Sequence, residues 1–156
     1  MAIRQIRIMG DEKLEKICRP IKEMTPKIRE LIFDMLDTMY DAQGVGLAAP
    51  QVGILRRLFV IDIGEGPLVM INPTILETSG EQRDQEGCLS LPGQAGMVTR
   101  PNYVKVRALN ENMEEFEMEA EGLLARAILH ENDHLDGIMY VRYVTDGLFD
   151  VGEAEE

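Results

Sequence analysis

The sequence predicts an α+β fold in which mostly antiparallel strands pack around a helix near the C-terminus, with an amphipathic helix near the N-terminus. Three observations lead to this prediction. Apolar residues recur at helical spacing over about 26–42, strand-like runs with short connections fill the middle, and a second helical stripe covers about 122–135. With 156 residues and neither an internal repeat nor an interdomain linker, the chain is expected to form a single domain over 1–156, with about 145–156 as a loosely ordered acidic tail.

Composition limits the class of protein. Apolar residues make up 45% and charged residues 28%, values that are typical of globular proteins and select no function. The formal net charge of −12 gives no electrostatic reason to bind nucleic acid or an anionic membrane, since both require clustered Lys and Arg. No apolar run resembles a signal peptide or approaches the roughly 20 residues of a membrane span. We therefore expect a cytoplasmic protein whose two cysteines, Cys18 and Cys88, stay reduced.

Helix start and stop signals define the first elements. The segment 11–18 (D-E-K-L-E-K-I-C) predicts a short helix with acidic residues in its first turn, in which Cys18 is a packed thiol. Thr25 followed by proline is a strong helix start, and an amphipathic helix is predicted over about 26–42. The uncharged stretch 43–53 (Q-G-V-G-L-A-A-P-Q-V-G) is either a turn before a strand or a backbone that lines a site.

The middle of the chain is predicted to be sheet. Runs rich in β-branched and aromatic residues lie at 56–63, 68–73 and 74–79. The last two meet at Pro73, and all the connections are too short for crossover helices, which favours antiparallel pairing. The segments 103–109 and 113–120 alternate apolar and polar residues, so we expect an antiparallel hairpin whose glutamates form a solvated face.

The only two histidines of the chain lie four residues apart in I-L-H-E-N-D-H-L-D-G (128–137). On the helix predicted over 122–135, His130 and His134 share one face, where two imidazoles can chelate one divalent metal. Glu131 lies beside them, where a carboxylate can take a proton from a metal-bound water. The alternative, a surface helix with two solvated histidines, is disfavoured because this spacing is combined with a Glu after the first His.

A third protein ligand is then required. A metzincin pattern needs His at position 140, where this chain has Tyr140. A thermolysin-like site takes a downstream Glu, and the only candidate, Glu153, lies in the acidic tail. Cys88 remains, since a thiolate and two imidazoles make a three-ligand catalytic site with an open position for water. The usual role of a lone Cys is that of a buried thiol, so residue types alone make Cys88 a candidate only.

Three stretches of the chain, G-V-G-L-A-A-P-Q (44–51), E-G-C-L-S (86–90) and H-E-x-D-H (130–134), together resemble the three motifs of the peptide deformylase family. The resemblance covers the chain from the opening I-M-G-D segment to about Val144. It implies a bacterial, metal-dependent hydrolase that removes the N-formyl group from the N-terminal formyl-methionine of newly made polypeptides. It also implies one divalent metal per chain, with Fe²⁺ as the physiological ion and Zn²⁺, Ni²⁺ or Co²⁺ as alternative occupants.

The resemblance further implies roles for individual residues. The metal ligands are Cys88, His130 and His134. Glu131 is the general base and then the general acid, and the Gln51 amide and the Leu89 backbone N–H stabilise the oxyanion. The substrate-binding residues are Gly44, Val45, Gly46, Gly87, Leu123 and Ala127. Glu86 and Arg100 form a supporting ion pair.

Two charged residues beside these motifs have open interpretations. Asp133 lies either close behind the metal ligands or in solvent. Arg126 stands where many family members have an apolar residue; it points either toward the pocket mouth, where it favours acidic residues after methionine, or toward solvent. The acidic end E-A-E-E differs from the basic helix by which some relatives touch the ribosome, which argues against docking by that route. Two other functions compete: an H-E-x-x-H metallopeptidase and a non-catalytic structural metal domain.

Overall fold

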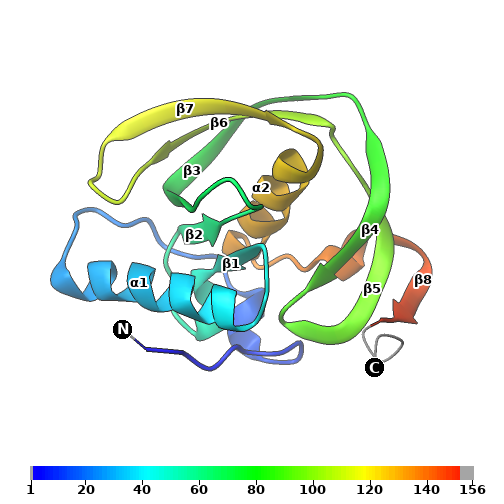
Figure 1. Cartoon of the computed structure of the whole chain (residues 1–156), viewed down its shortest axis with the longest axis horizontal. Helices are drawn as coiled ribbons and strands as arrows, with labels where there is room; N and C mark the ends of the chain where they lie inside the picture. Colours follow the sequence, from blue (N-terminus) through cyan, green and yellow to red (C-terminus); the bar gives the residue numbers. More distant parts are fainter. Residues whose placement is uncertain (1, 152–156) are drawn as a thin grey trace.

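The computed structural model describes residues 2–151, which form two antiparallel sheets and two α-helices (Figure 1). In chain order the elements are η1 (Glu12–Glu15), α1 (Pro26–Asp41), β1 (Gly46–Ala48), η2 (Ala49–Val52), β2 (Leu58–Ile61), β3 (Leu68–Ser79), β4 (Gln82–Cys88), β5 (Leu91–Arg100), β6 (Tyr103–Leu109), β7 (Glu115–Glu121), α2 (Gly122–Leu135), η3 (Tyr140–Tyr143) and β8 (Val144–Asp150). The η elements are single 3₁₀ turns, so the helix predicted over 11–18 is much shorter than expected.

The larger sheet has the strand order β1-β2-β3-β6-β7, and the smaller sheet has the order β4-β5-β8. Every neighbouring pair in both sheets is antiparallel. This arrangement confirms the predicted mixture of antiparallel strands and helices, including the hairpin formed by β6 and β7. In Figure 1, α2 lies between the larger sheet and the β4–β5 hairpin.

Helix α1 starts where the sequence predicts. The Thr25 hydroxyl accepts a hydrogen bond from the backbone N–H of Ile28 at 3.2 Å, and Pro26 occupies the first turn, where its missing N–H needs no partner. The apolar stripe of the helix is buried against the larger sheet. The buried apolar side chains of this stripe are Leu31, Ile32, Met35 and Met39.

Strand β2 is buried on both faces, which explains its uninterrupted apolar sequence. Leu58 and Val60 pack in the cluster that includes the α1 stripe, whereas Phe59 and Ile61 pack in the cluster that includes Ile128 of α2. The larger sheet is therefore covered by α1 on one face and by α2 on the other.

Helix α2 has the predicted extent and the predicted stop. Gly137 has φ 77°, a left-handed conformation that favours glycine. A Cβ at this position would lie 2.7 Å from the backbone oxygen of Glu15, so the close approach of η1 also requires glycine. These contacts fix the end of the helix that carries both histidines.

Two sequence predictions were wrong, and one strand was not predicted. The runs 68–73 and 74–79 are one strand, in which Pro73 is accommodated at a register irregularity and Asn72, with φ 52°, uses its side chain to bond Ile21. The polar stretch before Cys88 is a strand, β4, although it lacks apolar alternation. The tail predicted to be loosely ordered pairs with β5 as β8, at least to Asp150.

The part of the tail from residue 152, including Glu153, lies outside the described residues. Among residues 2–151, no helix is both long and apolar enough to cross a membrane.

Candidate metal centre

The structure brings together the three side chains that the sequence offers as metal ligands. Cys88 ends β4, and His130 and His134 lie one turn apart on α2. One ligand atom from each residue, a sulfur and two ring nitrogens, lies within 4.8 Å of the others. The Cys88 Sγ is 3.3 Å from His134 Nε2. Among the described residues this is the only cluster of three or more His, Cys, Asp or Glu side chains with such spacing.

The surroundings of the two histidines fit a metal ion. His130 Nδ1 lies 2.6 Å from the Glu86 carboxylate, so the imidazole can donate its Nδ1–H there and keep a lone pair on Nε2. His134 is 1% exposed and directs Nε2 toward the Cys88 sulfur. A thiolate and two imidazoles are a donor set that suits zinc or iron.

Glu86 is held by cationic partners on both carboxylate oxygens. Arg100 donates to Oε1 at 2.7 Å and to Oε2 at 2.9 Å, and Arg126 donates to Oε2 at 2.6 Å. Burial alone would raise the pKa of Glu86, but the hydrogen bonds from Arg100 and His130 and the charge of Arg100 hold this pKa well below its ordinary value. The carboxylate therefore remains ionised beneath His130. The predicted Glu86–Arg100 pair is present, whereas the contact with His130 was missed because two distant segments form it.

Asp133 also belongs to this cluster. Its carboxylate pairs with Arg100 at 3.0 Å, and its side chain is only 20% exposed. Of the two interpretations from sequence, the solvated carboxylate is therefore wrong. Asp133 is thus linked to His130 through Arg100 and Glu86.

Arg126 is buried, so the interpretation that it points toward solvent is wrong. The residue is 4% exposed, and its Nε, Nη1 and Nη2 donate to Gln82 Oε1 at 3.2 Å, to Glu86 Oε2 at 2.6 Å and to Val98 O at 3.0 Å. The physical reason is the β4–β5 hairpin, which covers this side of α2. Because the guanidinium is engaged within the protein, it does not lie in solvent, although Arg126 contributes to the lining of the pocket beside the metal ligands.

Glu131 is a buried carboxylate without hydrogen bonds. It is 4% exposed, its Oε2 lies 4.0 Å from His130 Nε2, and its Oε1 has no hydrogen-bond partner among residues 2–151. Burial raises the pKa of the Glu131 carboxyl to about 7. A carboxyl with this pKa and an unused oxygen is suited to accept and return a proton near neutral pH.

Gln51 is oriented by its own backbone turn. Its Oε1 accepts a hydrogen bond from the Ala48 N–H at 2.9 Å, and this contact turns the amide nitrogen toward Ser90 Oγ at 3.0 Å and Cys88 Sγ at 3.5 Å. Ser90 is fully buried and was missed from sequence. The only signal for it is its place in E-G-C-L-S, where a small polar residue follows the two positions that carry predicted functions.

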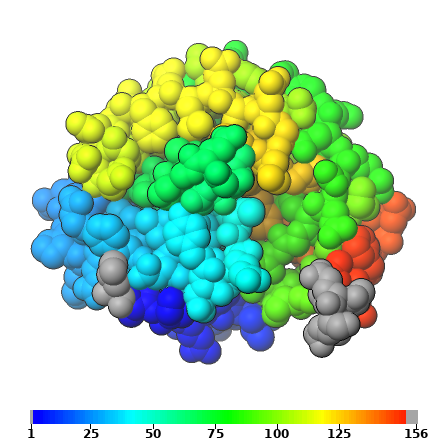
Figure 2. Space-filling view, in the orientation of Figure 1, coloured from blue at the N-terminus to red at the C-terminus, as the bar shows by residue number. Residues whose placement is uncertain are grey.

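A pocket of about 490 Å³ opens beside these groups. Figure 2 shows α2 recessed between the segment around Gly46 and the β4–β5 hairpin. The predicted substrate residues all line the pocket: Gly44, Val45, Gly46, Gly87, Leu123 and Ala127. Val45 and Leu123 are 46% and 55% exposed, so their apolar surface is open to a ligand. The hairpin also contributes Leu91 and Pro92, which sequence reasoning did not include because it did not predict the hairpin.

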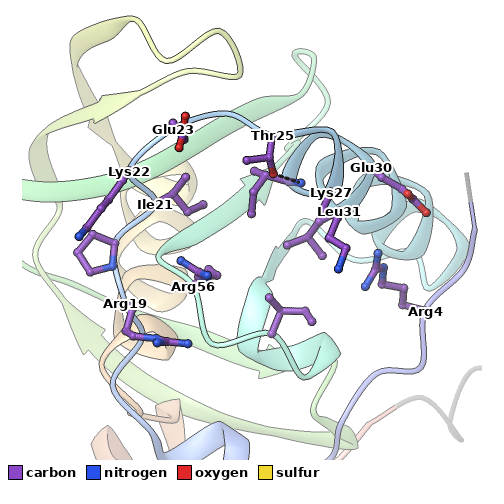
Figure 3. Close-up of a pocket in the computed structure, with 13 residues that line it drawn as sticks. Arg4, Arg19, Ile21, Lys22, Glu23, Thr25, Lys27, Glu30, Leu31 and Arg56 are labelled. Atoms are coloured by element: carbon purple, nitrogen blue, oxygen red, sulfur yellow. Dashed lines mark hydrogen bonds between the residues drawn. The ribbon is translucent and has the colours of Figure 1, made fainter.

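A larger hollow, of about 880 Å³, lies at the start of α1 (Figure 3). Basic side chains surround it, among them Arg19, Lys22 and Arg56. It shares no lining residue with the smaller pocket and contains no cysteine or histidine. The smaller pocket is therefore the candidate active site, because it is lined by Cys88, His130 and Glu131. The larger hollow is lined by none of these residues.

Comparison with known proteins identifies the family of this chain. A sequence profile of the polypeptide deformylase family matches residues 3–147. The chain belongs to this family. It is 64% identical over 151 residues to the peptide deformylase of Agathobacter rectalis, across 97% of this chain and 96% of the relative. Deformylases are metal-dependent, and the activity of this chain is the removal of the N-formyl group from nascent polypeptides.

Solved deformylase structures share the fold. The crystal structure of a peptide deformylase from Legionella pneumophila matches with a TM-score of 0.89 and 45% identity, over 92% of this chain and 87% of the other. The peptide deformylase from Synechococcus elongatus, crystallised in complex with actinonin, matches with a TM-score of 0.88 and 44% identity, over 90% of this chain and 78% of the other. The fold is thus that of the family.

Proposed function

We propose that this chain forms one catalytic domain that removes the formyl group from an N-terminal formyl-methionine, with one divalent metal held by Cys88, His130 and His134. One observation carries the proposal: three metal-ligand atoms lie within 4.8 Å of one another, and the Glu131 carboxylate beside them has Oε2 4.0 Å from His130 Nε2 and an Oε1 without a hydrogen-bond partner among residues 2–151. On this proposal α2 is the metal-binding helix. The physiological ion is Fe²⁺, with Zn²⁺, Ni²⁺ or Co²⁺ as alternative occupants of the same ligands.

Formamide hydrolysis requires a strong nucleophile at neutral pH. A bound divalent metal would supply it by lowering the pKa of a water molecule toward neutrality. Glu131 accepts the proton from that water and later passes it to the leaving amine. Its buried, unpartnered oxygen and its raised pKa support both transfers.

Two donors stabilise the developing oxyanion. The Gln51 amide is already oriented toward the Cys88 sulfur by its hydrogen bond to Ala48, so little reorganisation is needed to reach a substrate oxygen. The backbone N–H of Leu89, directly after Cys88, supplies the second hydrogen bond.

The substrate backbone lies against residues 44–46 as an added strand. These residues lead into β1, which is at the edge of the larger sheet and has β2 as its neighbour there. The methionine side chain enters the pocket lined by Val45, Leu123, Ala127 and the ring of His130. Nascent chains are made in the cytoplasm, where we place the enzyme, and we propose no nucleic acid or membrane partner.

The proposal is tested by anaerobic metal analysis with a parallel assay on formyl-Met-Ala. We expect one divalent metal per chain and release of formate. Cleavage of an unformylated peptide, with no action on formyl-Met-Ala, would instead establish the competing metallopeptidase. Bound metal with neither activity would favour a structural metal domain.

Gly46 is expected to be required for the position of Glu131. A Cβ at residue 46 would lie 2.6 Å from Glu131 Oε2, so Gly46→Ala must displace the buried carboxylate. Misplacement of a reacting group by about 1 Å can lower a rate about 10²-fold, and we expect a decrease in kcat of this order. Steady-state kinetics and metal content check the result: the metal should remain bound, and an unchanged kcat would refute the proposed role of this contact.

A further inference from the structure

Arg126 carries a buried charge that the proposed mechanism does not use. A buried guanidinium loses its hydration, and the protein must replace every hydrogen bond that water provided. All three nitrogens of Arg126 donate to acceptors of the β4–β5 hairpin, namely Gln82, Glu86 and Val98. A residue that only filled space on α2 would need none of these contacts.

The partners of Arg126 lie on the element that carries Cys88. Glu86 is on β4 and Arg100 is on β5, so the Glu86–Arg100 pair lies within the hairpin and does not join it to α2. Arg126, His130 and Asp133 project from one side of α2, and each of them contacts that pair. Through these contacts the helix docks onto the hairpin ion pair.

This docking sets the geometry of the metal ligands. Cys88 is two residues after Glu86 on the hairpin, whereas both histidines are on the helix. The distance from the Cys88 sulfur to the two imidazoles therefore depends on how the hairpin sits on α2. Glu86 also presents Oε1 to His130 Nδ1 while its Oε2 is held by Arg126, at 2.6 Å in each case.

We propose that Arg126 is a positioning residue of the metal centre: by binding Glu86, Gln82 and Val98 it holds the hairpin with Cys88 against the helix with His130 and His134. This inference rests on the proposed function, because it takes these three residues as the metal ligands. Arg126 is not one of the three metal ligands, and it acts on them through Glu86.

The test is binding of Co²⁺ to the full chain, measured by competition with a chelator and by the thiolate-to-cobalt absorption band. Arg126→Met keeps an unbranched, flexible apolar stem but removes the hydrogen bonds and the charge. We expect Co²⁺ affinity to fall about 10–100-fold, the range typical for residues that orient metal ligands, and the cobalt band to change. Arg126→Lys restores a cationic donor to Glu86 without the planar fork and should recover part of the affinity.

Arg4→Met is the matched control. Arg4 Nε donates at 2.9 Å to the buried carboxylate of Asp34, which lies on α1. This ion pair is away from the metal ligands. This variant should lower Tm while leaving Co²⁺ affinity and the cobalt spectrum unchanged. If Arg126→Met binds Co²⁺ as tightly as the unaltered chain and with the same spectrum, the proposal is overturned, whatever its Tm.

Two further outcomes are decisive. If Arg126→Met does not fold, Arg126→Gln retains an amide donor without the charge, and unaltered Co²⁺ binding by that variant overturns the proposal. The binding assay uses no substrate, so its result is separate from the proposed function. Cobalt binding that depends on Arg126 without deformylation contradicts the function alone, whereas deformylation with cobalt binding that is independent of Arg126 contradicts this inference alone.

Discussion

Replacement of Glu131 by glutamine is expected to lower kcat on formyl-Met-Ala by about 10²–10⁴-fold, the usual contribution of a general acid–base residue. Glutamine has nearly the same shape but cannot accept the proton from water or return it to the leaving amine. Glu131 is 4% exposed and its Oε1 has no hydrogen-bond partner among residues 2–151, so no other side chain depends on that oxygen. The metal ligands should therefore stay in place, and the variant should still bind one divalent metal per chain.

Metal analysis, Tm and steady-state kinetics on the same preparation separate the two effects. The variant should have an equal or higher Tm, because a neutral amide costs less to bury without a partner than a carboxylate does. Catalytic residues often reduce stability in this way. Glu115→Gln, on the exposed face of β7, is the matched control and should leave kcat and metal content unchanged. Deformylation by Glu131→Gln at the rate of the unaltered chain would refute the proposed mechanism.

The elements that the sequence predicts well are those specified by local contacts. The Thr25–Pro26 start and the apolar stripe define α1, and clean alternation defines β6 and β7. Strand β4 has no such signal, because its sequence Q-R-D-Q-E-G-C contains no apolar alternation. It is a strand because β5 supplies its hydrogen bonds and α2 supplies partners for its polar side chains, and both are non-local.

The same distinction separates the parts of the site. The spacing of His130 and His134 is local and is visible in the sequence, whereas Cys88 is tied to them only by elimination and by family resemblance. The Gln51–Ser90 hydrogen bond joins residues far apart in sequence, and no periodicity predicts it. Arg126 illustrates this limit. Because the hairpin was not predicted, neither interpretation of Arg126 from sequence included the hydrogen-bond partners that β4 and β5 supply.

Cys88→Ala and His134→Ala are each expected to lose both the metal and the turnover. Each variant leaves two of three protein ligands, so metal affinity should fall by more than the roughly 10–100-fold typical of residues that only orient a ligand. The contrast with Glu131→Gln is the useful result, because that variant should lose turnover alone. Metal content after dialysis and formate release from formyl-Met-Ala measure the two losses.

Cys18→Ala is the matched control for the loss of a thiol. Cys18 is 3% exposed in the apolar core, and burial raises its pKa to about 11, so it stays a neutral thiol and not a metal-binding thiolate. This variant should keep its metal and its activity, with at most a lower Tm. Retention of metal and activity by Cys88→Ala would mean that the third ligand lies elsewhere. Since residues 2–151 hold no other such cluster, that result would direct attention to Glu153, the ligand that a thermolysin-like site would use.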